Sequence, residues 1–180
     1  MLNITIPKQE LYDEEKNEFI MSEEKSICLE HSLVSVSKWE SKWKKPFLSK
    51  DEKTIEEIID YIKCMTITQN VDDNIYKCLS KDNIKFINDY IDDKMTATTF
   101  YDTRKNIGRS ETITSELIYF WMISLNIPME CQKWHLNRLL TLIRICNIKN
   151  DSGKKMSRSE INSRNAALNA ARRKKLNTRG

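Results

Sequence analysis

The order of apolar and polar positions divides the chain into a short β-rich start and a longer helical part. Over residues 1–31 the two kinds of residue alternate in short runs, which is the period of a half-buried strand. This pattern predicts strands over 2–6, 18–21 and 26–30, with an acidic, turn-like stretch over 7–17. The spacing predicts a small antiparallel meander. Because so small a sheet is not stable alone, we expect it to pack against helices.

From residue 32 onward the apolar residues recur at helical spacing. Ser32 is a suitable N-cap for a first helix. Thr54, with Glu57 three residues later, forms a capping box that predicts a second helix. Each helix is expected to bury one apolar stripe. The predicted stripes are Leu33, Val36, Trp39 or Glu40, and Trp43 in the first helix, and Ile55, Ile58, Ile59 and Ile62 in the second.

Two further helices follow before a long irregular stretch. Asp72 or Asp73 precedes a short helix, and Ser80 precedes a longer one, because all three side chains are good N-caps. Residues 92–112 have no clear period and contain many turn-forming residues. The sequence therefore predicts a loop here, with a short strand over 96–101.

The strongest helical pattern lies in residues 115–126 and 129–147. Thr114 or Ser115 begins the first of these helices, and Pro128 suits the first position of the second. Two helices joined by a short turn are also the form of a DNA-binding helix-turn-helix. The middle of the second helix is apolar nearly all round, however, which favours a buried helical hairpin.

The C-terminal part of the chain is basic. A capping box of Ser157 and Glu160 opens an alanine-rich helix over 158–175. Residues 151–180 carry nine Lys/Arg and two acidic residues, a net charge of +7, while residues 1–150 carry 21 basic and 24 acidic residues, a net charge of −3. The tail indicates an anionic partner: nucleic acid, an acidic protein surface or the chain's own body. A solubilising tail is the plainer alternative.

Together these elements predict an α+β protein, in which a small N-terminal antiparallel β-meander packs on a mainly helical body with a basic C-terminal helix. The body spans 1–150, β-rich over 1–31 and helical over 32–150, and residues 151–180 form the basic helix or tail. No apolar run is long enough to span a membrane, and the start does not resemble a signal peptide. The five cysteines include no Cys-x-x-Cys pair, so we expect reduced thiols in a cytosolic protein.

Tryptophan is common in this chain, and two of the four tryptophans lie one helical turn apart. Trp39 and Trp43 share a helix with Lys38 and Lys42, at the same spacing. Such an aromatic and basic face stacks nucleobases or becomes buried in a partner. The alternative is an internal face packed on the strands, since Leu33 and Val36 continue the same stripe.

Two Cys/His pairs have the spacing of metal ligands. Cys28 precedes His31 by three residues, and Cys131 precedes His135 by four, which places the second pair on one face of a helix. The four side chains together would suit tetrahedral zinc. The alternative is two ordinary buried thiols and two partly exposed imidazoles, and we predict no metal.

Enzyme chemistry is not indicated. The chain lacks the nucleophile elbow, the glycine-rich phosphate loop and the zinc-protease helix motif. It has three glycines in all, too few to cradle a phosphate in a loop of that kind. A Cys131–His135 nucleophile pair is one explanation of the spacing, but two residues at the edge of the core, one turn apart, are the explanation we favour. We predict a protein that is not an enzyme and binds no cofactor.

Several blocks of the sequence resemble small proteins of tailed bacteriophages, usually called tail assembly chaperones or small tail proteins. The blocks begin with EHSLVSVSKWESKWKKPF and cover residues 30–47, 95–100, 113–122, 125–128, 134–143 and 167–173. The resemblance implies a non-enzymatic assembly protein in the host cytoplasm, which keeps the tape-measure or tail-tube protein soluble until the tube polymerises. The residues expected to bind that partner are Trp39, Trp43, Trp134, Arg138, Arg172, Arg173, Lys174 and Lys175.

Two other roles stay open from the sequence. One is a structural subunit of the particle, such as a neck, tail or baseplate protein, which would make the virion its location. The other is a nucleic-acid-binding protein that uses the basic tail, whose binding would fall steeply with salt.

Overall fold

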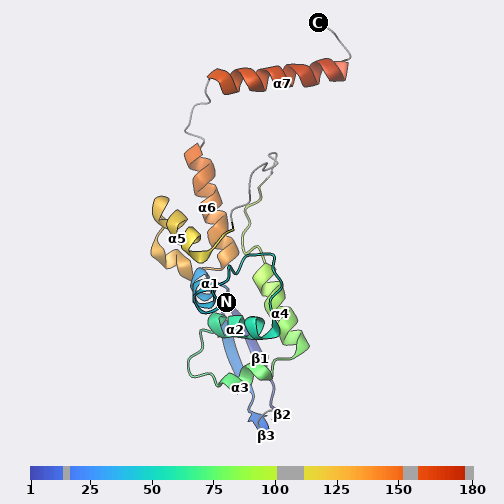
Figure 1. Cartoon of the computed structure of the whole chain (residues 1–180), viewed down its shortest axis with the longest axis vertical. Helices are drawn as coiled ribbons and strands as arrows, with labels where there is room; N and C mark the ends of the chain where they lie inside the picture. Colours follow the sequence, from blue (N-terminus) through green and yellow to red (C-terminus); the bar gives the residue numbers. More distant parts are fainter. Residues whose placement is uncertain (14–16, 101–111, 152–157, 177–180) are drawn as a thin grey trace. The chain divides into compact units, whose positions relative to one another are not determined.

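The computed structural model describes residues 1–13, 17–100, 112–151 and 158–176 (Figure 1). The chain forms two compact units, Met1–Arg144 and Ile145–Gly180. None of the helices in the described ranges is both long and apolar enough to cross a membrane. The α+β class is confirmed, with antiparallel strands at the N-terminus followed by helices.

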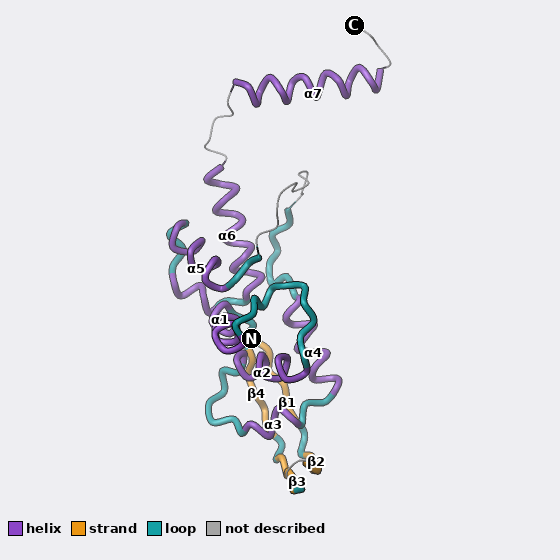
Figure 2. Tube along the Cα trace, viewed as in Figure 1, coloured by secondary structure: helices purple, strands orange, loops and turns teal. Residues whose placement is uncertain are grey.

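The strands form a long hairpin with two ladders rather than a meander. β1 (Leu2–Ile6) pairs with β4 (Lys25–Leu29), and β2 (Gln9–Asp13) pairs with β3 (Glu18–Ser22), both antiparallel. The two ladders keep one register, since Ile6 lies opposite Lys25 and Gln9 lies opposite Ser22. Pro7 lies at the interruption, where its missing N–H cannot continue the ladder. In Figure 2 the β2–β3 ladder continues the end of the β1–β4 ribbon.

The strand over Gln9–Asp13 is the element that the sequence did not predict. Its acidic composition favours a turn, but pairing with β3 overrides that local preference. The three predicted strands are confirmed within one residue at each end. The predicted meander was wrong about which strands pair. The additional strand β2 pairs with β3, so β1 pairs with β4 instead of with the next predicted strand.

One face of the β1–β4 ribbon belongs to the core. The alternation predicted from the sequence is present: Ile4, Ile6, Ile27 and Leu29 are buried. On the other face the hydroxyl groups of Thr5 and Ser26 lie 2.9 Å apart. The free edge of β4 is covered by the chain that follows the second helix, where Ile67 N donates to Cys28 O at 2.8 Å.

The first helix agrees with its prediction. α1 (Leu33–Trp43) begins at Ser32, whose side chain accepts from Ser35 N. It ends at Lys44, which adopts a left-handed conformation with φ of 56°. Leu33, Val36 and Trp39 are buried, as their stripe predicts.

The second helix has its predicted cap but a different buried face. α2 (Ile55–Met65) begins with the Thr54–Glu57 capping box. Ile55 is 77% exposed, and of the predicted isoleucine stripe Ile62 is the member that is buried. The side facing α1 instead buries Glu57 and other polar or aromatic residues, because tryptophan and lysine side chains of the first helix bond to its carboxylates and carbonyls.

α3 (Asp73–Lys77) and α4 (Lys81–Asp92) begin as predicted, with Asp72 and Ser80 as caps. α4 contacts β1. The segment after α4 contains no strand as far as it is described, up to residue 100. The rest of the predicted strand lies outside the described residues.

The predicted helical hairpin is confirmed in its first helix and corrected in its second. α5 (Ser115–Ser124) begins at Thr114, and η1 (Met129–Lys133) is a short 3-10 helix. The backbone of Trp134 is extended, and α6 (Leu136–Asp151) begins two residues later. The break forms because Leu136 N donates to His31 O at 2.8 Å, which is a tertiary bond. The continuous second helix required by the helix-turn-helix alternative is therefore absent from this described part.

In the second unit, α7 (Arg158–Leu176) confirms the predicted basic helix. The predicted cap residue Ser157 lies outside the described residues.

Candidate partner-binding surface

Trp39 is a core residue and does not form part of the surface. Its side chain is 1% exposed. The indole N–H donates to Glu57 O at 2.8 Å, and the ring meets Phe47 edge-on at 5.2 Å between centroids. Trp39 therefore belongs to an internal face of α1, and it is not available to bind a partner or to stack on a base.

Trp43 is half-buried and already bonded to α2. Its indole N–H donates to Asp60 Oδ2 at 2.9 Å. Lys42 forms an ion pair with the same carboxylate, and Asp60 raises the pKa of this lysine mainly through that hydrogen bond. The aromatic and basic face predicted on α1 thus turns in large part toward its neighbouring helix.

Trp134 and Arg138 are brought together at the surface. The Arg138 guanidinium lies 4.4 Å from the centre of the Trp134 ring, which is a cation–π distance. Trp134 is 36% exposed, and Arg138 is exposed as well. A partner can therefore reach this predicted pair. Because the two side chains are already stacked on each other, they lose less conformational entropy when a partner binds.

The sequence did not identify several exposed apolar residues on α5 and η1, the two elements that precede this pair in the chain. Phe120 and Ile123 lie one turn apart on α5 and are 61% and 67% exposed, and Met129 in η1 is 44% exposed. Tyr119 OH donates to Gln132 Oε1 at 2.9 Å and so fastens α5 to η1. The sequence did contain a signal for these residues. Residues 115–124 are apolar on nearly all sides, whereas a helix that buries a single face needs apolar residues on that face alone. We call Phe120, Ile123, Met129, Trp134 and Arg138 the hairpin surface.

The four cations predicted at the C-terminus lie in the second unit. Arg172, Arg173, Lys174 and Lys175 occupy the last turns of α7, and all four are exposed. Cations stabilise a helix C-terminus through its dipole. Four in succession cover a full turn, so the positive charge surrounds this end of the helix.

The predicted metal ligands are only half assembled. His31 and His135 meet with ring centroids 5.0 Å apart. His31 Nδ1 is bonded to Tyr61 OH, and His135 Nε2 is bonded to Tyr90 O at 2.9 Å. The expectation that Cys131 and His135 share a helix face was wrong, because the helix is interrupted between them. Across the described ranges no three His, Cys, Asp or Glu side chains are grouped to hold a metal ion.

The histidine pair instead connects distant parts of the first unit. Burial, and then the neighbouring His135, lower the pKa of His31 to about 3, so this imidazole is neutral. Beside it, Glu30 accepts from Tyr90 OH at 2.7 Å. The cluster therefore joins the end of β4 to α2, α4 and α6.

Comparisons with protein-family models, with curated proteins and with solved structures each gave no match to this chain.

Proposed function

We propose that this protein is a non-enzymatic assembly protein of a tailed bacteriophage, which binds the tape-measure or tail-tube protein in the host cytoplasm. The observation that carries the proposal is the hairpin surface, where large apolar side chains stand exposed on α5 and η1. Several large apolar side chains exposed on neighbouring elements mark protein-binding sites more often than single exposed ones do. The sequence blocks over 113–122 and 134–143, which resemble phage tail proteins, include Phe120, Trp134 and Arg138 of this surface.

The partner that best fits the hairpin surface is an amphipathic helix with acidic residues beside its apolar stripe. Phe120 and Ile123 supply the apolar contact. Lys133 and Arg138 are exposed cations next to Trp134 and supply the charge complement. Binding in this way would cover the apolar stripe of the partner and keep it soluble before the tube forms.

The test is capture of the tape-measure or tail-tube protein of the same genome by the full chain. The variant Phe120→Gln/Ile123→Gln removes the apolar contact, and we expect capture to weaken by about thirtyfold or more, since the loss of even one buried anchor of an interface costs about 2 kcal/mol. The matched control is Ile55→Gln/Phe86→Gln, because these residues are 77% and 62% exposed on other helices. Equal capture by the two double variants would contradict the proposal.

Quantitative mass spectrometry of purified particles and infected-cell lysate separates an assembly chaperone from a particle subunit. We expect the protein to be abundant in the lysate and missing from the particles. Retention at a fixed number of copies per particle would instead make the hairpin surface a contact between subunits.

A further inference from the structure

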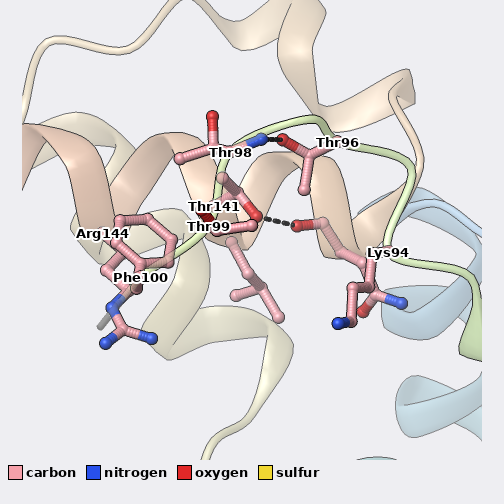
Figure 3. Close-up of a pocket in the computed structure, with 9 residues that line it drawn as sticks. Lys94, Thr96, Thr98, Thr99, Phe100, Thr141 and Arg144 are labelled. Atoms are coloured by element: carbon pink, nitrogen blue, oxygen red, sulfur yellow. Dashed lines mark hydrogen bonds between the residues drawn. The ribbon is translucent and has the colours of Figure 1, made fainter. Parts of the chain in front are cut away.

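A second surface feature of the first unit is lined by none of the five residues of the hairpin surface. An open cleft runs between α6 and the segment that follows α4 (Figure 3). We call it the threonine cleft, because Thr96, Thr98, Thr99 and Thr141 line it. Lys94 and Arg144 lie toward its two ends, with the threonines between them (Figure 3).

The walls of the cleft are held in place by side-chain hydrogen bonds. Asn137 Nδ2 donates to Ile91 O at 3.0 Å and to Asp93 O at 2.8 Å, so it attaches the start of the segment to α6. Thr98 N donates to Thr96 Oγ1 at 3.1 Å and fixes a turn within the segment. Arg144 lies over the Phe100 ring, 4.1 Å from its centre, and closes one end. A site with fixed walls loses little entropy when a ligand binds.

The chemistry of the cleft suits an anion. It has a cation toward each end, and none of its lining residues, all of them in the described chain, is acidic. The Thr96 hydroxyl accepts a backbone bond, so its hydrogen remains for a ligand oxygen. Separated cations with hydroxyl groups between them match a chain of successive phosphates better than a single phosphate ion.

The stacked pair at one end adds a second kind of contact. Phe100 is half-buried, and Arg144 covers it with a planar guanidinium. Aromatic rings and guanidinium planes are the groups on which unpaired bases stack, and they occur beside cationic grooves in proteins that bind single strands.

We propose that the threonine cleft binds single-stranded nucleic acid, with Lys94, Arg144 and the Thr96 hydroxyl group on the phosphates and the Phe100–Arg144 pair against a base. This proposal does not depend on the proposed function, because it concerns a different surface. It also differs from binding through the basic tail, since the cleft lies in the first unit.

The test is the anisotropy of a labelled oligothymidylate, titrated with the full chain at several salt concentrations. We compare Lys94→Gln/Arg144→Gln with Lys50→Gln/Lys81→Gln, which removes two exposed cations elsewhere and has the same net charge. Loss of two phosphate contacts on a single strand reduces the magnitude of the salt slope by about 1.4. We expect that reduction, with affinity lower by about tenfold, in the cleft variant alone. The basic tail is identical in both variants, so its contribution cancels.

A third variant tests stacking separately from charge. Phe100→Leu keeps an apolar side chain but removes the ring, so we expect weaker binding of the oligonucleotide with an unchanged salt slope. The proposal is overturned if the cleft variant and its charge-matched control behave alike. It is overturned too if polyglutamate competes as well as unlabelled oligothymidylate does, because the cleft would then hold any polyanion.

Discussion

At the scale of single residues, buried polar side chains connect segments that are distant in the sequence. Glu40 is the main example, since its carboxylate accepts from Phe47 N at 2.8 Å and from Ser115 N at 2.7 Å. The second bond joins α1 to the start of α5. Glu40 is 7% exposed, so both N–H groups depend on its carboxylate in a largely buried site.

We expect Glu40→Ala to lower the free energy of unfolding by about 2–5 kcal/mol, because two buried donors lose their acceptor. Glu40→Gln keeps one acceptor oxygen and should fall between this variant and the natural chain. Urea denaturation measures both, with Glu52→Ala, at an exposed position, as the control. A change within about 0.5 kcal/mol for Glu40→Ala, the size typical of a surface substitution, would show that the bonds are dispensable.

His31 makes stability depend on pH. Its pKa is about 3 in the folded chain against an ordinary value of 6.5, with burial as the larger cause and His135 as the smaller. Between these values the unfolded chain binds a proton that the folded chain does not, so the free energy of unfolding falls as the pH is lowered from 6.5.

Between pH 7 and pH 5, His31 alone should lower the free energy of unfolding by about 2 kcal/mol. Urea denaturation at the two pH values measures the loss, and His31→Gln removes the titrating group. We expect the variant to lose about 2 kcal/mol less than the natural chain over that interval. Equal losses would mean that His31 is protonated in the folded state.

At the scale of elements, side-chain caps determine where the helices of the first unit begin. Thr54 is the most complete case, since its hydroxyl accepts from Glu57 N at 3.3 Å and Thr54 N donates to Glu57 Oε2 at 2.8 Å. Lys45 forms an ion pair with the same glutamate, and Lys45 and the Thr54 backbone lower its pKa.

We expect Thr54→Ala to lower the free energy of unfolding by about 1 kcal/mol, the usual cost of losing an N-cap. Thr54→Ser keeps the hydroxyl and should lose much less. Thermal or urea unfolding of the two variants measures the difference, and equal losses would show that the methyl group rather than the cap accounts for the effect.

At the scale of the whole molecule, stability and charge are divided between the two units. The buried hydrophobic residues found in the described chain run from Ile4 to Ile143, all within the first unit. The described side chains of α7 are exposed. The basic tail changes the net charge from −3 to +4 without supplying any of these core residues.

A chain ending at residue 150 should therefore unfold with nearly the same free energy, within about 0.5 kcal/mol. All four tryptophans precede that point, so their fluorescence reports the transition in both chains. A loss well above that range would show that the basic tail stabilises the first unit.

The sequence alone determined the local elements of this protein. Hydroxyl caps at Ser32, Thr54, Ser80 and Thr114 predicted where helices begin, because capping needs only neighbouring backbone groups. Alternation of apolar residues predicted β1 and β4 for the same reason, since the two-residue period of side chains is a local property of a strand.

The tertiary structure decided what depends on distant partners. It made Gln9–Asp13 a strand by pairing it with β3, and it broke the helix after Lys133 by a bond from Leu136 to His31. It left Ile55 of α2 and Phe120 and Ile123 of α5 exposed, because the buried faces of these two helices are determined by the elements that they meet. The threonine cleft brings together residues about 40 positions apart in the sequence. Local hydrophobic periodicity carries no information about contacts over such a separation.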